Sequence, residues 1–368
     1  MPEDDKALLN AASRMGIIGL LVYGHLHYDK RHTWQGIRCE AVRGMDPDKA
    51  IGAVPGIAFF TRDQFGHWMR KNESFSVADP ARWKDEDKQE FLCNLGLSAM
   101  GDTDGGIDFA AENKVPVLEL RFGAWIQETE KYQQKLASWR QNGGKCLSIH
   151  FPDFSWDENG FSGRETLEQA VRGALQLGAD RITCHVPRVS VGTFADKDIA
   201  GKTADAAAEI LRPLVAANIV IGIENLHMRP GEKADEERGF GYTPEEVLSF
   251  IAMLKQRGVP VGLHLDIGHA RNNAPYSQKY NVSDWLTLGN HQINGMHLHQ
   301  VAIDTDGSFL NHQPITEPFG KLISLASLFS AWRNGDIPKV PLILEIRKGK
   351  GPDSLFALRN YLSIKKGV

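Results

Sequence analysis

The sequence predicts a (β/α)8 TIM barrel, an α/β fold, preceded by an N-terminal extension of about 90 residues. From about residue 91, short apolar runs alternate with helix-length segments, which is typical of βα units built on a parallel sheet. Eight such runs occur in residues 91–368, close to the roughly 250 residues usual for this barrel. No glycine-rich GxGxxG turn follows an early run, which disfavours the alternative of a doubly wound open sheet.

Each expected strand is a short apolar run bounded by turn signals. In chain order, strands are expected at 92–99, 115–122, 145–151, 181–186, 219–225, 261–267, 295–301 and 341–346. The segments between them predict helices at 106–113, 126–141, 166–177, 203–217, 244–256, 282–288 and 322–333. The helix at 244–256 has the clearest start, because Thr243 and Glu246 form a capping box around Pro244.

Residues 1–90 do not follow the βα rhythm. They contain His25, His27 and His32 in a short window, a spacing that suits a metal site. The same spacing is common in a polar loop or in a partly buried aromatic patch, and we prefer that interpretation to a metal site. We therefore interpret this segment as an extension that packs on the barrel or on a second subunit, and we predict no function for it.

Composition and charge exclude several classes of protein. The 368 residues carry 46 acidic and 42 basic side chains, a net charge of −4, and 42% are hydrophobic, as in ordinary globular proteins. Nucleic acid is not an expected partner, because phosphate binding needs a local excess of Lys and Arg. The four cysteines form no CxxC pair and no run is apolar enough to span a membrane, so we expect a cytoplasmic protein; a homo-oligomer is left open.

Polar side chains close six of the expected strands: His150, His185, Glu224, Asp266, His297 with His299, and Glu345. In a parallel barrel the carboxyl ends of the strands form the active site, and residues two apart on a strand share a face. These side chains should therefore meet in the barrel mouth, with His264 beneath Asp266. Carboxylates and imidazoles in such proximity need a neutralising cation. We expect a divalent metal (Mn, Zn, Mg, Co or Fe), and mixed nitrogen and oxygen donors favour zinc, manganese or iron.

From about Leu92 to the C-terminus, the chain resembles the xylose isomerase-like TIM barrels, which include sugar isomerases, sugar epimerases and endonuclease IV-type AP endonucleases. The resemblance rests on the order and strand positions of five motifs. They are Ile-Glu-Asn at 223–225, Leu-Asp-Ile-Gly-His at 265–269, His-Leu-His at 297–299, Asp-Gly-Ser at 306–308 with His312 downstream, and Leu-Glu-Ile-Arg at 344–347.

The resemblance implies roles for individual residues. By position, the metal ligands of the isomerase and epimerase branch correspond to Glu224, Asp266, His297 and Glu345. His269 matches a substrate-binding position of that branch. Candidates for additional metal ligands, most of them by the endonuclease pattern, are His150, His185, His269, His299 and His312. That pattern also has an aspartate two residues before the last histidine, and Leu310 stands there instead.

The preferred hypothesis is a divalent-metal-dependent isomerase or epimerase of a sugar or sugar phosphate. Glu224 and Glu345 would exchange a proton next to a carbonyl on two faces of the substrate, while the metal stabilises the charge that develops. His269, Arg347 and His185 would bind the substrate. The alternatives are an endonuclease IV-like phosphodiesterase, which the surplus of histidines supports, and a non-catalytic barrel that binds a metal or a sugar.

Overall fold

The computed structural model describes residues 84–229, 231–272, 276–280, 282–303 and 309–316, most of 319–363, and five strands between residues 20 and 75. The chain divides into two compact units. The first comprises Met1–Arg82, Pro318–Ser330 and Lys366–Val368, and the second comprises Trp83–Glu317 and Ala331–Lys365. The predicted division near residue 90 stays a prediction.

The described part of the first unit consists of short strands. β1 (Leu20–Tyr23), β3 (Ile37–Ala41) and β2 (Lys30–Trp34) form a sheet in that order, and β4 (Ile57–Arg62) pairs antiparallel with β5 (Trp68–Phe75). A further antiparallel pair joins β17 (Phe319–Gly320) to β18 (Ile323–Ser324). His32 lies on β2, whereas His25 and His27 fall outside the described residues.

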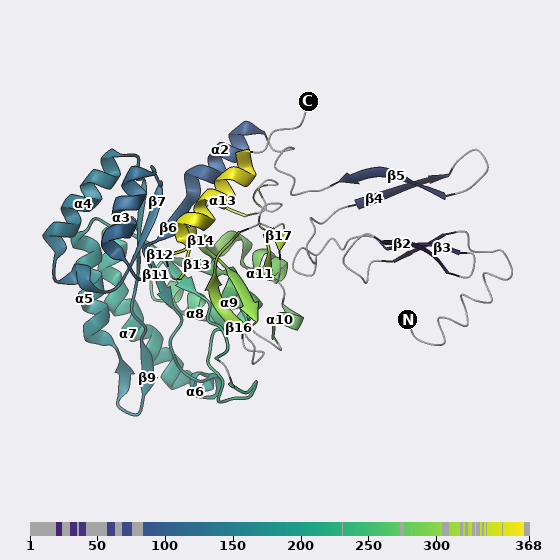
Figure 1. The fold of residues 1–368 in the computed structure, drawn as a ribbon. Helices are drawn as coiled ribbons and strands as arrows, with labels where there is room; N and C mark the ends of the chain where they lie inside the picture. Colours follow the sequence, from purple (N-terminus) through teal and green to yellow (C-terminus); the bar gives the residue numbers. More distant parts are fainter. Residues whose placement is uncertain are drawn as a thin grey trace. The chain divides into compact units, whose positions relative to one another are not determined.

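The second unit contains a closed parallel barrel with the strand order β11-β12-β13-β14-β19-β6-β7-β8 (Figure 1). Every strand overlaps an expected one, so the predicted barrel is confirmed and the open sheet is excluded. The strands are β6 (Leu95–Ser98), β7 (Val117–Arg121), β8 (Cys146–His150), β11 (Arg181–His185), β12 (Val220–Glu224), β13 (Val261–Asp266), β14 (Ile293–Leu298) and β19 (Leu342–Leu344).

Helices follow the strands and cover the barrel. Six match expected helices: α3 (Thr103–Glu112), α4 (Thr129–Gln141), α5 (Arg164–Gln176), α7 (Lys197–Ala216), α8 (Pro244–Gln256) and α11 (Val282–Gly289). The Thr243 side chain caps α8 by accepting a hydrogen bond from the Glu246 amide at 3.4 Å, as predicted. Among the described residues, no helix is both long enough and apolar enough to cross a membrane.

Several elements differ from the sequence prediction. Residues 92–94, expected in a strand, end helix α2 (Asp85–Asn94), and helix α13 (Gly351–Ser363) closes the ring by packing on β6 and β19. The helix expected at 322–333 lies partly outside the described residues, and its start is strand β18. Gln300 and Val301, expected at the end of β14, begin a hairpin of β15 (Gln300–Ile303) and β16 (Phe309–Gln313).

Smaller elements lie in the connections between the strands and the main helices of the barrel. They are 3-10 helices η2 (Ala124–Ile126) and η3 (Asn290–Gln292), the short helices α6 (Val191–Ala195), α9 (Ile267–Arg271) and α10 (Tyr276–Lys279), and a hairpin of β9 (Ser155–Asp157) and β10 (Gly160–Ser162). Of these, α9 and the β15–β16 hairpin carry residues of the candidate site described below.

The apolar core fills the layer between the strands and the helices. Leu118, Ile149 and Ile221 from the strands have no exposed surface, and neither have Trp125 and Trp139 from the helical layer. Because side chains alternate along each strand, the residues between these apolar positions face the barrel interior. This alternation stabilises the barrel from outside and leaves its interior to polar side chains.

A close approach between α5 and η2 makes one glycine necessary. A Cβ atom on Gly173 would lie 2.4 Å from Cζ3 of Trp125, a ring with no exposed surface. Alanine normally stabilises a helix interior by about 1 kcal/mol relative to glycine, but overpacking a core costs about 1–3 kcal/mol. At this position the steric cost should outweigh the propensity gain.

We expect Gly173→Ala to lower the free energy of unfolding by about 1–2 kcal/mol for this reason. Gly201→Ala in α7 is the matched control, because the nearest atom to its Cβ would be Arg257 Nη2 at 3.9 Å. The control should be neutral or more stable by up to about 1 kcal/mol. Urea unfolding midpoints measure both, and an unchanged or raised midpoint for Gly173→Ala would contradict the packing argument.

Candidate metal centre

Polar side chains from the carboxyl ends of the strands meet in the barrel mouth. Glu224, Asp266 and His297 have no exposed surface, and Glu345 is 1% exposed. One ligand atom of each of the four lies within 4.8 Å of those of the other three. The structure therefore assembles the predicted four-residue set, while the roles of its members stay a prediction.

His297 lies among the carboxylates of this set. Its Nδ1 is 3.0 Å from Glu224 Oε1, 3.5 Å from Glu345 Oε2 and 3.9 Å from Asp266 Oδ2. Burial alone would lower the pKa of His297, but the surrounding carboxylates raise it well above its ordinary value. Without a metal, the protonated ring thus supplies positive charge where the carboxylates converge, whereas a metal bound at Nδ1 would displace that proton and supply the charge instead.

One buried oxygen of the set tests whether a cation suits this site. Glu345 Oε2 is buried and forms no hydrogen bond of good geometry with a described residue, although His312 Nδ1 lies 3.2 Å and His297 Nδ1 3.5 Å from it. A coordinated cation would satisfy this oxygen better than these two poorly aligned contacts do. Together with the mixed oxygen and nitrogen donors, this oxygen indicates that the four residues fit a divalent metal.

A second group of donors adjoins the first through Glu224. His150 and His185 lie with Nε2 atoms 3.2 and 3.4 Å from Glu224 Oε2. The Nδ1 of His150 donates to the Phe151 carbonyl at 2.9 Å, and that of His185 lies 2.6 Å from Asp153 Oδ1. With Nδ1 held in this way, the Nε2 atoms of both rings face the same carboxylate oxygen, an arrangement that a shared cation would stabilise.

The protonation of His185 agrees with this arrangement. Burial lowers the pKa of His185, which favours the neutral ring. Burial also opposes the ionised form of Asp153, but His185 and Arg188 lower the pKa of that carboxyl group. A carboxylate therefore orients a neutral imidazole here, as carboxylates behind metal-binding histidines commonly do.

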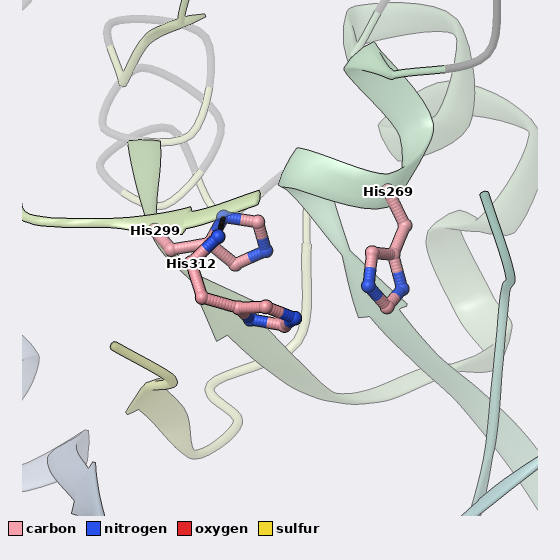
Figure 2. Close-up of side chains that lie close together, drawn as sticks. All are labelled: His269, His299 and His312. Atoms are coloured by element: carbon pink, nitrogen blue, oxygen red, sulfur yellow. Dashed lines mark hydrogen bonds between the residues drawn. The ribbon is translucent and has the colours of Figure 1, made fainter. Parts of the chain in front are cut away.

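A third group consists of His269, His299 and His312 (Figure 2). Figure 2 shows His269 on the short helix α9, across from His299 and His312. His269 Nδ1 lies 3.0 Å from the Asn225 carbonyl, and His299 Nε2 lies 3.0 Å from Asp266 Oδ1. The ring centroids of His299 and His312 are 4.5 Å apart. Through His269 and His299, these histidines thus adjoin the four-residue set at Asp266.

Local backbone structure explains two of the sequence motifs. Asn225 locks the ends of β12 and β13 together, because its side chain donates to the Asp266 carbonyl and accepts from the Asp266 amide, at 3.0 and 2.8 Å. Asp266 in turn caps α9 by accepting from the His269 amide at 2.7 Å. Gly268 must lack a side chain, because a Cβ there would lie 1.8 Å from His299 Cε1.

His312 reaches the site from a left-handed backbone position on β16, with a φ of 57°. This conformation is uncommon for a residue other than glycine and stores a small amount of strain. Its amide donates to His299 Nδ1 at 3.0 Å, and its own Nδ1 lies 3.2 Å from the Glu345 carbonyl oxygen. The strained turn thus ties the hairpin to the end of β19.

Two site residues were missed by the sequence analysis, which considered only the ends of strands. Glu119 and Arg121 lie on β7 and share its inner face. Glu119 has no exposed surface and accepts from Ser148 Oγ at 2.9 Å and from Thr183 Oγ1 at 3.1 Å. Arg121 donates to Glu345. The available signal was Val-Leu-Glu-Leu-Arg, in which two charged residues alternate with apolar ones.

Arg347 differs from the other predicted site residues. Its side chain is exposed, whereas the members of the cluster are buried, and its amide donates to the His312 carbonyl at 3.1 Å. Arg121 is the arginine that contacts Glu345. The structure therefore does not bring the Arg347 side chain into the cluster, and its substrate-binding role stays a prediction.

Comparisons with known proteins agree with the fold. The profile of the xylose isomerase-like TIM barrel family matches residues 107–361. A D-tagatose 3-epimerase-like protein is 18% identical with a TM-score of 0.52, over 73% of this chain and 97% of that one. A putative xylose isomerase from Rhodospirillum rubrum is 14% identical with a TM-score of 0.57, again over 73% and 97%.

A protein from Thermus thermophilus, whose crystal was soaked with ZnCl2, is 19% identical with a TM-score of 0.50, over 73% of this chain and 98% of that one. A search of curated proteins found no match. At these identities the structural likeness establishes the fold, and the family match rests on the sequence profile.

The position of Glu119 generates a prediction about metal affinity. Glu119 Oε1 lies 2.9 Å from His297 Nε2, so it holds the ring with Nδ1 directed at the other carboxylates. Loss of such an orienting carboxylate typically weakens metal binding about 10- to 100-fold. We expect Glu119→Gln to weaken zinc or manganese binding by that factor in chelator-competition titrations.

The control for this variant is Glu112→Gln, which removes an exposed carboxylate at the end of α3. Its metal affinity should equal that of the unmodified protein. Circular dichroism and thermal melting of both variants establish that they fold. Unchanged metal affinity in folded Glu119→Gln would show that Glu119 does not orient a metal ligand.

Proposed function

Because the chain belongs to the xylose isomerase-like TIM barrel family, we propose that it is a divalent-metal-dependent isomerase or epimerase acting on a sugar or sugar phosphate. The observation that carries the proposal is the buried set of Glu224, Asp266, His297 and Glu345, whose ligand atoms lie within 4.8 Å of one another and include a Glu345 oxygen without a hydrogen bond of good geometry. The structural likeness to a D-tagatose 3-epimerase-like protein supports the same class of chemistry.

The residues of the chain would transfer the proton. Burial opposes ionisation of Glu224 and Glu345, but His297, with neighbouring histidines and with Arg121 at Glu345, lowers the pKa of both well below the ordinary value. Both are therefore ionised near neutral pH, and each can accept a proton from a carbon next to a carbonyl. A bound divalent metal would stabilise the negative charge that develops on the substrate oxygens.

In the proposed enzyme, His269 and His185 would hold substrate hydroxyl groups. Burial lowers the pKa of His269 well below its ordinary value, and it also lowers that of His185. Their neutral rings can exchange hydrogen bonds with hydroxyl groups without adding charge to the site. We therefore keep His269 and His185 as substrate-binding residues in the proposed enzyme.

The proposed enzyme would work in a reducing compartment. Cys93, Cys146 and Cys184 are free thiols in the described structure, and Cys184 is buried. Free cysteines are usual in cytoplasmic proteins, where thiols stay reduced. We therefore include a cytoplasmic location in the proposal. A small carbohydrate substrate is the other part of it, and it follows from the proposed class of enzyme.

Replacing either carboxylate should abolish proton transfer. In D2O with a divalent metal, we expect the unmodified protein to incorporate deuterium into a sugar or sugar phosphate substrate, as followed by NMR. Glu224→Gln and Glu345→Gln should lose this exchange by at least about a hundredfold, because an amide cannot accept the proton. Metal content is measured in parallel, and unchanged exchange in either variant would refute the assignment of that residue.

A second candidate function is metal-dependent hydrolysis of a phosphate ester, as in endonuclease IV-type proteins. The specific observation that favours it is the group of His150, His185 and Glu224, whose donor atoms also lie within 4.8 Å of one another. A one-metal epimerase does not need this second group. Against it stands Leu310, which replaces the aspartate of the endonuclease pattern and is 39% exposed.

Metal counting and a cleavage assay separate the two functions. We expect one tightly bound ion per chain by inductively coupled plasma mass spectrometry, and no incision of abasic duplex DNA with zinc or manganese. Two or three ions together with incision would establish the hydrolase instead. No bound ion after loading with either metal would favour a non-catalytic protein.

A further inference from the structure

A cavity of about 220 Å3 opens beside the candidate metal centre. His150 and His185 form part of its wall, and both also contact Glu224 of the metal centre. The cavity is therefore placed to hold the part of a substrate that lies next to the reacting carbon. Its other wall residues consequently bear on which substrates fit.

Two guanidinium groups line this cavity. The Arg121 side chain is 34% exposed and that of Arg188 is 26% exposed. Asp153 is the acidic residue in the same wall, and it is engaged by His185 Nδ1 at 2.6 Å and by Arg188 Nε at 3.0 Å. The wall thus carries two guanidinium groups and one carboxylate, and both guanidinium groups are ion-paired, Arg188 with Asp153 and Arg121 with Glu345 of the metal centre.

The bond to Asp153 orients Arg188 and leaves donors free. Only Nε of Arg188 is hydrogen-bonded among the described residues, so its terminal nitrogens have no protein partner there. Arg121 similarly uses one terminal nitrogen, on Glu345. An arginine held by a carboxylate in this way presents a planar set of N–H donors that matches the oxygens of a phosphate or carboxylate.

Resting on the proposed function, we propose that the cavity with Arg121 and Arg188 binds an anionic group, and that the substrate is a carbohydrate bearing a phosphate or a carboxylate. The remaining N–H donors of the two guanidinium groups favour such an oxyanion over the hydroxyl of a neutral sugar. Phe122 and Phe151, which line the same cavity, offer apolar surface to the C–H groups of the carbon chain. The two arginines lie together on this cavity although the chain as a whole has a net charge of −4.

The experiment uses inorganic phosphate as the probe and the metal-free protein, because phosphate also binds metals. Calorimetric titration should detect phosphate binding to the unmodified protein. Arg188→Gln should weaken it about tenfold to a hundredfold, the contribution of a charge-assisted hydrogen bond. Arg188→Lys, which keeps the charge but loses the planar donors, should fall between the two. Phosphate binding that is absent from the unmodified protein, or equal in Arg188→Gln, would overturn the inference.

The matched control is Arg172→Gln, which removes an exposed arginine from α5 and should leave phosphate affinity unchanged. Thermal melting verifies that each variant is folded. Gluconate, titrated in parallel, distinguishes the two oxyanions: tighter binding of phosphate indicates a phosphate ester, and tighter binding of gluconate indicates a sugar acid. D-fructose, the neutral probe, should bind more weakly than either.

Deuterium exchange on the metal-loaded protein separates failure of this inference from failure of the proposed function. Exchange with a neutral sugar that is as fast as with its phosphate ester and its acid would refute the anionic substrate and leave the isomerase or epimerase intact. Absence of exchange with every carbohydrate, together with phosphate binding that depends on Arg188, would refute the proposed function and leave the anion site standing.

Discussion

The burial of four carboxylates inside one barrel is the constraint on which the rest of the site depends. Glu119, Glu224, Asp266 and Glu345 are all at most 1% exposed. Such a group of charges is stable only if positive charge lies among them. His297 provides it between Glu119 and Glu224, and Arg121 provides it at Glu345. A divalent cation would serve the same electrostatic need.

Barrel geometry makes this concentration of charge possible. The pairing of neighbouring strands sets His185 beside Glu224, and Asp266 beside His297. Side chains that alternate with these, such as Ile221 and Ile223, face the helices and are completely buried. The apolar outer layer therefore stabilises the fold while the inner face is left free for chemistry.

Local signals explain what the sequence could predict. Strand and helix patterns are local, and a polar residue that ends an apolar strand points to the rim of a barrel, which identified Glu224 and Asp266 in advance. Glu119 lies in mid-strand, where the same alternation also describes an ordinary half-exposed strand. Arg347 shares the parity of Glu345, but Glu345 directly follows the end of β19 at Leu344 whereas Arg347 lies two residues further on, where strand alternation no longer sets the direction of the side chain. Whether the side chains of Glu119 and Arg347 enter the site depends on where the strands end and how they pair. Neither is determined by a short segment of sequence.

Glu224 links the two proposed chemistries because its two oxygens belong to different groups. Oε1 lies 3.0 Å from His297 Nδ1, whereas Oε2 lies 3.2 Å from His150 and 3.4 Å from His185. Glu224 can accept a substrate proton at Oε2 only while no cation engages that oxygen. In the proposed enzyme, proton transfer by Glu224 and occupation of every group of donors by a metal would therefore exclude each other, which is why the number of bound ions distinguishes the two proposed functions.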